Sequence, residues 1–284
     1  MNLEKVLAWS FAPLEHTLHP RDCMLYALGI GIGADASAPA DLQFCYENDL
    51  KVFPALVNVI AHPGAWITAP ELEVNWVKLL HGEQSFEIFK PLEASKTYVG
   101  NYRVRDVLDK GEGKGALLFL EKELRDKDSD ELVSRVTSTY FLRGDGGHGG
   151  TITQAPAPHA LPERPAERSL SLPTLPQAAL IYRLSGDYNP IHAEPALAAK
   201  AGFDRPILHG LCTLAVATRA VLKAYAGDNP ARLKSLQLRF SAPVYPGETI
   251  VTEFWQDGDV VSFRAKVAER DLVVLNNGRA VIAP

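Results

Sequence analysis

The stretch from Leu208 to Ala226, "LHGLCTLAVATRAVLKAYA", indicates the architecture of this 284-residue chain. Read as a helix, it is apolar around most of its circumference, and Arg219 and Lys223, one turn apart, form a charged stripe that we expect to face solvent. Gly227 and then Pro230 follow as stop signals. The pattern predicts one long buried helix.

Four runs of alternating apolar and polar residues follow this predicted helix. They cover residues 235–240, 249–255, 260–268 and 272–282. Alternation with period two is typical of strands with one buried face, and pairs such as Pro246-Gly247 and Asp257-Gly258 mark turns between the runs. The second half of the chain is therefore predicted to be one helix followed by an antiparallel sheet.

The first half repeats this order in a weaker form. Residues 52–61, "VFPALVNVIA", form a shorter apolar helix candidate. Predicted strands follow at 83–89, 97–108, 115–124 and 132–142. Such self-similarity indicates an internal duplication. The order of elements predicts an α+β fold in which an antiparallel sheet wraps one central helix, twice over.

A segment rich first in glycine and then in proline separates the two halves. Residues 143–178 have the composition of an irregular, partly extended connection. We therefore divide the chain into a first unit at 1–145, a linker at 146–172 and a second unit at 173–284.

The overall composition argues against several classes of function. The net charge is −5, the pI is about 5.9 and the 29 Lys and Arg residues form no basic stripe, so we expect no binding to nucleic acid. No apolar run approaches the ~20 residues that a membrane span needs. We expect a cytoplasmic protein for three reasons. The three cysteines are widely spaced, and Glu4 is acidic where a targeting peptide would avoid an acid. The C-terminal "RAVIAP" carries no peroxisomal address.

The stretch "GIGIGAD" at 29–35 formally matches the glycine fingerprint of dinucleotide-binding folds. That fingerprint requires a helix N-terminus to receive the pyrophosphate. The residues that follow contain Pro39 and show little helical periodicity. We therefore expect no dinucleotide site here.

The stretch 182–192, "YRLSGDYNPIH", places an acid and an imidazole on either side of an Asn-Pro break. A short helix is predicted to end at Gly186, and Pro190 forces the chain to restart, so the side chains of Asp187 and His192 can converge. A carboxylate and a neutral imidazole that share one water would form an acid/base pair. The plainer interpretation, in which Asp187 only caps the next helix and His192 lies at the surface, stays open.

His209 and Gly210 stand at the start of the predicted buried helix. The first amides of a helix have no partner inside the helix, and glycine permits the close approach of a carbonyl oxygen. The Gly210 N–H is therefore a candidate oxyanion donor. The alternative is that Gly210 only relieves crowding where the helix meets the sheet.

These residues resemble a known family. "YRLSGDYNPIHAEPALAAKAGF" (182–203) and "RPILHG" (205–210) closely resemble the hydratase 2 motif of the (R)-specific enoyl-CoA hydratases, or MaoC-like dehydratases, which have the hotdog fold. The matching positions are Gly186, Asp187, Asn189, Pro190, His192 and Gly210. The similarity to the double-hotdog members extends through 26–35, 80–92, 107–116, 239–249 and 275–282.

The resemblance implies reversible syn addition of water to a trans-2-enoyl-CoA, giving an (R)-3-hydroxyacyl-CoA, without a metal or redox cofactor. It makes Asp187 and His192 a catalytic dyad, gives Asn189 a role in fixing their loop, and directs the Gly210 N–H to the thioester carbonyl. When "YALGIG" (26–31) is aligned with "YRLSGD" (182–187), the first half has neither the acid nor the histidine. We therefore expect a single dyad.

The resemblance also implies substrate contacts outside the dyad. The first half is expected to make room for a long or bulky acyl chain and to contribute to the coenzyme A site. The expected contacts are His81, Gly82, Lys110, Arg239 and Phe240. For His81 the alternative is a core histidine satisfied by the backbone, and for Lys110 a solvated turn.

Two other kinds of function compete with the hydratase. One is a hotdog thioesterase or acyl-carrier-protein dehydratase, and the other is an inactive protein that only binds acyl thioesters. The intact Asp-x-Asn-Pro-x-His pattern at 187–192 favours the hydratase. We expect an acyl-CoA substrate and, from the family and the exposed sheet edges of such folds, a homodimer.

Overall fold

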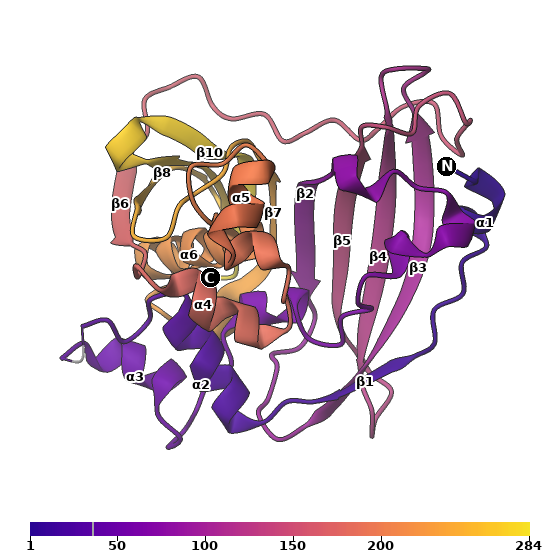
Figure 1. Cartoon of the computed structure of the whole chain (residues 1–284). Coiled ribbons are helices and arrows are strands. Elements are labelled where there is room, and N and C mark those ends of the chain that lie inside the picture. Colours follow the sequence, from indigo (N-terminus) through magenta and orange to yellow (C-terminus); the bar gives the residue numbers. More distant parts are fainter. Residues whose placement is uncertain (36) are drawn as a thin grey trace.

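The computed structural model describes residues 1–35 and 37–284, and its centre is one sheet of ten strands (Figure 1). The strand order is β1-β3-β4-β5-β2-β7-β10-β9-β8-β6. All neighbouring strands are antiparallel. The α+β fold predicted from the sequence is confirmed.

The first unit contributes five strands and a series of short helices. The strands are β1 (Leu14–Thr17), β2 (Leu79–Ile88), β3 (Thr97–Asp109), β4 (Ala116–Asp126) and β5 (Leu132–Leu142). The helices are α1 (Leu3–Leu7), α2 (Pro20–Gly29), α3 (Pro39–Cys45), η1 (Pro54–Asn58), η2 (Trp66–Thr68), η3 (Pro70–Leu72) and η4 (Trp76–Lys78).

The second unit contributes the other five strands and the longest helix. The strands are β6 (Arg168–Pro173), β7 (Leu233–Phe240), β8 (Thr249–Asp257), β9 (Val260–Val267) and β10 (Leu272–Ile282). The helices are α4 (Ala178–Tyr182), η5 (Arg183–Ser185), η6 (Pro190–His192), α5 (Pro195–Lys200), α6 (Gly210–Val221), η7 (Leu222–Ala226), η8 (Pro230–Arg232) and η9 (Ala268–Arg270). The chain between β5 and β6 runs without regular structure past the sheet, and β6 begins inside the predicted linker (Figure 1).

The two units have the same topology, as the internal repeat in the sequence predicts. Within each unit the strands lie in the order first, third, fourth, fifth, second. The second strands of the two units, β2 and β7, pair at the centre, with Glu83 opposite Arg239 and Glu87 opposite Ser235. Two hotdog units are thus joined edge to edge into one continuous sheet.

The helix predicted at 208–226 is present, although its last part is wound differently. Helix α6 is followed directly by a single π-helical turn, η7, which ends at Gly227 with a left-handed φ of 59°. The prediction of a solvent-facing stripe is wrong, because Arg219 and Lys223 instead donate to the buried Asp41 of α3, at 2.8 and 3.1 Å. These bonds fasten α3 of the first unit to the central helix of the second.

The helix predicted at 52–61 is wrong. Only Pro54–Asn58 is helical, as a 3-10 turn, and the fully buried segment ends at Ala61 with a left-handed φ of 50°. Asn58 donates to the Ala55 carbonyl at 2.8 Å, a local bond that competes with helical pairing. Among its described residues, the first unit therefore has no counterpart of α6.

The glycine motif at 29–35 closes a turn, and its backbone groups pair with other parts of the fold. The seven-residue helix α3 follows it, where the sequence showed little helical periodicity. Gly31 and Gly33 have φ of 81° and 78°, and the Gly33 N–H donates to Asp41 at 3.0 Å while the Gly31 carbonyl accepts from Arg219 at 2.8 Å. The motif is used to attach α3 to α6.

Two further expectations concern the surroundings of the protein. Within the part of the chain that the structure describes, no helix has both the length and the apolar character to cross a bilayer. Cys23, Cys45 and Cys212 are all free thiols.

Candidate active site

The loop that carries Asp187 is shaped by three residues of the sequence motif. Gly186 ends the preceding helical turn with a φ of 122°, a conformation that favours glycine. The Asp187 carboxylate accepts the Asn189 N–H at 3.1 Å, and the Asn189 side chain caps η6 by accepting the Ile191 N–H at 3.2 Å. This arrangement leaves the Asp187 side chain exposed and places His192 at the end of η6.

His192 is buried and held by a single defined hydrogen bond. Its Nδ1 lies 2.8 Å from the Ile207 carbonyl, and because a carbonyl can only accept, Nδ1 is the donor. In the neutral ring the free lone pair therefore resides on Nε2. Desolvation lowers the pKa of His192 below its ordinary value of 6.5, so the ring is neutral at pH 7.

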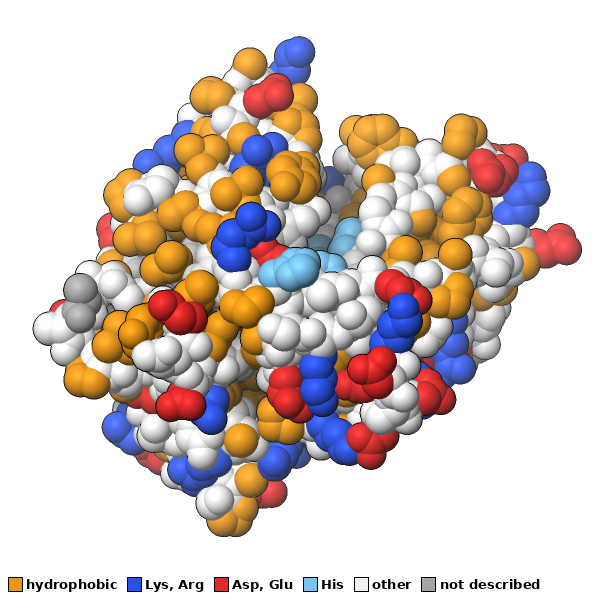
Figure 2. All heavy atoms as spheres, turned by 90° about the horizontal axis from the view of Figure 1, so that it is seen from below, with side chains coloured by type: hydrophobic (Ala, Val, Ile, Leu, Met, Phe, Trp, Pro, Cys, Tyr) orange, Lys and Arg blue, Asp and Glu red, His pale blue; other side chains and the backbone are white. Residues whose placement is uncertain are grey.

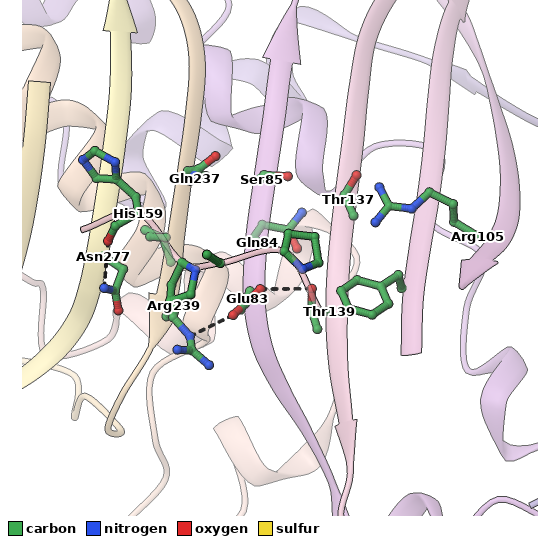
Figure 3. A pocket seen from close by; sticks show the side chains of 15 residues that line it. Glu83, Gln84, Ser85, Arg105, Thr137, Thr139, His159, Gln237, Arg239 and Asn277 are labelled. Atoms are coloured by element: carbon green, nitrogen blue, oxygen red, sulfur yellow. Dashed lines mark hydrogen bonds and ion pairs between the residues drawn. The ribbon is translucent and has the colours of Figure 1, made fainter. Parts of the chain in front are cut away.

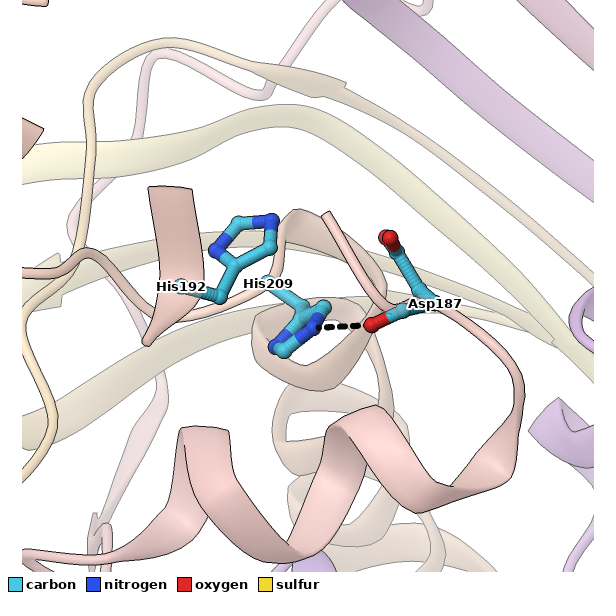
Figure 4. Close-up of side chains that lie close together, drawn as sticks. All are labelled: Asp187, His192 and His209. Atoms are coloured by element: carbon cyan, nitrogen blue, oxygen red, sulfur yellow. Dashed lines mark hydrogen bonds between the residues drawn. The ribbon is translucent and has the colours of Figure 1, made fainter. Parts of the chain in front are cut away.

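His209 lies directly against this pair, and the sequence analysis assigned no role to its side chain. Its ring stacks on His192 with centroids 3.7 Å apart and an interplanar angle of 26°. Its Nε2 lies 3.1 Å from the backbone carbonyl of Asp187 (Figure 4). A histidine just before a glycine at the start of a buried helix was the only signal in the sequence.

The structure brings Asp187 and His192 together, as their spacing suggested. A carboxylate oxygen of Asp187 and a ring nitrogen of each of His192 and His209 lie within 4.8 Å of one another. The space-filling view shows histidine side chains beside an acidic and a basic group at the end of a deep hollow between two lobes (Figure 2). Asp187 is exposed, so its carboxylate can be reached by a ligand at the surface.

The same three side chains fit a metal ion poorly. Nδ1 of His192 and Nε2 of His209 donate to carbonyls, so the lone pairs reside on Nε2 of His192 and Nδ1 of His209. Nδ1 of His209 is buried, which leaves Asp187 and Nε2 of His192, one ligand fewer than the three protein ligands of a typical catalytic zinc site. The set suits proton transfer better than coordination.

Gly210 offers a backbone donor next to these groups. It is the first residue of α6, so its N–H has no acceptor within the helix, and the residue is exposed. A Cβ at this position would lie 3.2 Å from the Phe240 ring, so a side chain would crowd the site. Both readings of this glycine from the sequence, oxyanion donor and relief of crowding, are therefore compatible with the structure.

His81 lies beyond Phe240, on the first unit's side of the site. Its ring packs edge-on against Phe240 at 5.0 Å and tilted against Tyr140 at 5.1 Å. Nε2 donates to Gln84 Oε1 at 2.8 Å, and Gln84 in turn donates to Asn58 at 2.8 Å. Desolvation lowers the pKa of His81 to about 4, so its ring is neutral and fixed in one tautomer.

The Asp187 charge reaches side chains of the first unit. Desolvation lowers the pKa values of His62 and His81, and the Asp187 carboxylate opposes that change at both rings. His62 follows the buried segment 52–61, and its Nδ1 accepts the Gly64 N–H at 3.1 Å. The site therefore lies between the two units, and the sequence gave no sign of His62.

The remaining predicted contacts lie elsewhere. Gly82 stands at a bulge of β2, where the register shifts between His81 and Glu83. Lys110 is exposed in the β3–β4 hairpin, with Nζ 4.9 Å from the centre of the Phe141 ring. Arg239 is bound to Glu83 at 2.8 Å, in a cavity of about 210 Å³ that is roofed by residues 156–159 on the face of the sheet away from the helices (Figure 3). Arg239 is therefore separated from the dyad by the sheet.

Comparison with protein families divides the chain as the fold does. Residues 16–144 match the MFE-2 hydratase 2 N-terminal domain, and residues 158–277 match the MaoC like domain. The two matches correspond to the two units of the structure.

Several named proteins are similar over nearly the whole chain. The 3-hydroxyacyl-thioester dehydratase Y of Mycobacterium tuberculosis is 41% identical over 91% of this chain and 90% of that protein. The peroxisomal enoyl-CoA hydratase 2 of Arabidopsis thaliana is 35% identical over 96% and 93%. Peroxisomal multifunctional enzyme type 2 of Mus musculus is 38% identical over 92% of this chain, which spans about a third of that enzyme, 36% of its length.

A solved structure shows the same arrangement. The crystal structure of a MaoC-like dehydratase from Phytophthora capsici superimposes with a TM-score of 0.85 and is 36% identical, covering 100% of this chain and 99% of that chain.

Proposed function

The chain belongs to the MaoC-like dehydratases that carry an MFE-2 hydratase 2 N-terminal domain, and from this premise we propose how it acts as a hydro-lyase on enoyl-CoA. The substrate is a trans-2-enoyl-CoA and the product an (R)-3-hydroxyacyl-CoA. The observation that carries this proposal is the meeting of Asp187 and His192, beside the residue at the start of α6 whose N–H has no acceptor within the helix.

Asp187 and His192 hold the reacting water. The carboxylate and the Nε2 lone pair of His192 both accept hydrogen bonds, so one water can donate to each of them while its oxygen faces the β-carbon of the substrate. As the water oxygen bonds to that carbon, His192 takes a proton. The resulting imidazolium is stabilised by Asp187 and returns the proton to the α-carbon on the same face, which gives syn addition.

Gly210 completes the chemistry. Attack at the β-carbon moves an electron pair through the double bond onto the thioester oxygen, and a backbone N–H directed at that oxygen is worth more in the transition state than in the ground state. The exposed amide at the start of α6 fits this role. Phe240 and His81 then line the side of the site that the first unit shares. The scheme needs no metal or redox cofactor.

The absorbance of a medium-chain trans-2-enoyl-CoA, followed by chiral analysis of the product, tests this function. We expect loss of the conjugated double bond and formation of the (R)-3-hydroxyacyl-CoA. Release of free thiol would identify a thioesterase. Binding of the enoyl-CoA without any change in absorbance, across several chain lengths, would identify an inactive binding protein.

Three further assignments complete the proposal. We propose a homodimer in the cytoplasm, without nucleic-acid partners, although two of the relatives above carry "peroxisomal" in their names. The net charge of −5 supports the exclusion of nucleic acid. Sedimentation equilibrium tests the dimer, and imaging of the tagged protein in its own cells tests the compartment.

A further inference from the structure

The side chain of His209 is enclosed between the dyad and the core. It is 1% exposed. One face of its ring stacks on His192 at 3.7 Å, and the Tyr182 ring packs against it with centroids 5.0 Å apart. The His192 ring therefore lies directly on the His209 ring (Figure 4). It is too buried to contact substrate itself.

His209 also fixes the backbone of the catalytic acid. Because the Asp187 carbonyl can only accept, Nε2 of His209 is the donor of their 3.1 Å bond. One side chain therefore sets the position of both dyad candidates, His192 through stacking and Asp187 through its main chain. The next residue along the chain is Gly210, the candidate oxyanion donor.

The His209 ring positions Asp187 and His192 in its neutral form. Desolvation and the neighbouring His192 lower the pKa of His209 to about 4, so it carries no charge at pH 7. A cation stacked on His192 would oppose the protonation of His192 during turnover. The neutral ring of His209 supports the His192 ring without this electrostatic repulsion.

Simple packing does not explain a histidine here. With Nε2 protonated, Nδ1 holds a lone pair, and this atom is buried without a hydrogen-bond partner among the described residues. A buried unpaired acceptor is unfavourable, and an apolar ring of similar size would avoid the cost. The bond to Asp187 is what the imidazole adds.

We propose that His209 is a positioning residue that holds Asp187 and His192 in register for hydration. This inference rests on the proposed function, because the register matters only if the two side chains act on one water. It does not give His209 a contact with the reacting atoms.

Three substitutions separate the two contacts. His209→Phe keeps the ring and removes the donor, His209→Gln keeps a donor near the ε position and removes the ring, and His209→Ala removes both. We expect kcat per folded molecule to fall on the order of 10- to 100-fold in His209→Ala, with KM changed less than about threefold, because misplacement of reacting groups acts on the chemical step. His209→Phe and His209→Gln should each recover part of the loss.

Tyr182→Phe is the matched control. It changes the other ring that packs on His209 by one hydroxyl and should leave kcat within about threefold of wild type. In His209→Ala the acid limb of kcat/KM should also move toward pH 6.5, because His192 becomes more solvated. Full kcat with an unchanged pH profile in His209→Ala, or losses that only follow the folded fraction, would overturn the proposal.

Nitrogen NMR of the histidine rings tests the positioning of His192 by His209 without a measurement of turnover. In the wild type the His192 ring should be neutral with its proton on Nδ1, and in His209→Ala it should exchange between tautomers and titrate at a higher pKa. An identical His192 signal in both proteins refutes positioning. A wild type that fails to hydrate enoyl-CoA while its His192 signal responds to His209→Ala refutes the proposed function, and shows that His209 still sets the state of His192.

Discussion

The two units share one strand order and differ in what fills the sheet. In the second unit the sheet wraps α6, a helix of 12 residues that pairs most of its backbone internally. In the first unit the equivalent space holds the five-residue η1 and the turn after it, and the ammonium of Lys122 on β4 donates to the carbonyls of Val57 at 2.6 Å and Ile60 at 2.9 Å. A duplicated sheet therefore tolerates the loss of its helix when a buried side chain supplies the missing donors.

The halves also meet as a symmetric pair would. Tyr26 and Tyr182 occupy equivalent positions in the aligned stretches "YALGIG" and "YRLSGD", and their rings pack on each other at 5.5 Å. Residues related by the repeat contact each other across the boundary, as equivalent residues do at a twofold interface. Gly31 stands where the second unit has Asp187, so the proposed mechanism operates in the second half alone.

The largest expected effect comes from the dyad. Asp187→Asn and His192→Ala should each lower kcat on the order of 1,000-fold or more, because the first unit has no second dyad to share the load. Asp204→Asn, an exposed acid in a nearby loop, is the control and should retain activity. Retention of about half the activity in either dyad variant would show a second active site and break the comparison.

The second-largest expected effect is on stability, at the salt bridges between Asp41 of the first unit and the central helix of the second. Asp41 is 3% exposed and holds Arg219 and Lys223 of the central helix, so Asp41→Asn leaves Arg219 without its carboxylate and Lys223 with only the longer contact to Asp228. We expect a loss of about 3 kcal/mol in the free energy of unfolding, measured in urea. Asp228→Asn removes a longer contact to Lys223 of 3.7 Å and should cost less than about 0.5 kcal/mol. Equal losses in the two variants would contradict the role given to Asp41.

Lys122 makes the stability of the first unit depend on pH. Burial lowers its pKa from 10.5 to about 7. Between these values the unfolded chain binds a proton that the folded chain has lost, so the free energy of unfolding rises with pH in this window. The increase from this group should be roughly 2 kcal/mol between pH 7 and 9.

Substitution of Lys122 tests this account of the missing helix. Lys122→Met should remove the increase and leave two buried carbonyls unpaired, at a cost of about 1–3 kcal/mol. The exposed Lys234→Met should keep the increase. The same rise with pH in Lys122→Met as in wild type would assign the effect to another group.

The smallest expected effect is a shift in the acid limb of the pH profile of kcat/KM. His192 acts as a base only when neutral, and desolvation lowers its pKa. On acidification, kcat/KM should therefore fall with a midpoint below 6.5, the ordinary histidine value. A midpoint at or above 6.5 would mean that His192 is not the desolvated base described here.

The sequence was most informative where the pattern is local. The strands at β5 and β10 have the predicted bounds, because alternation along a strand records which face is buried. The apolar run at 52–61 was misread as a helix, since a short apolar segment looks the same whether its carbonyls pair within it or with Lys122. That pairing is decided by a residue more than sixty positions away.

The residues of the candidate site also fall into those that a local motif predicts and those that only the fold brings together. Asp187, Asn189, His192 and Gly210 were predicted because they stand in one motif, and the structure brings Asp187 and His192 close together. The stacking of His209 and the approach of His62 depend on how the chain folds back, which no spacing records. The resemblance implied both Arg239 and Phe240 as substrate contacts, but adjacent residues of a strand point to opposite faces.

The central claim is that one Asp/His pair, in one half, adds water to one face of the double bond. Hydration of a trans-2-enoyl-CoA in D2O, with the relative configuration at the α- and β-carbons read by proton NMR, tests it most directly. The account predicts a single product in which the deuterium and the hydroxyl were added to the same face, with (R) configuration at the β-carbon. Anti addition, or a mixture of configurations, would contradict it.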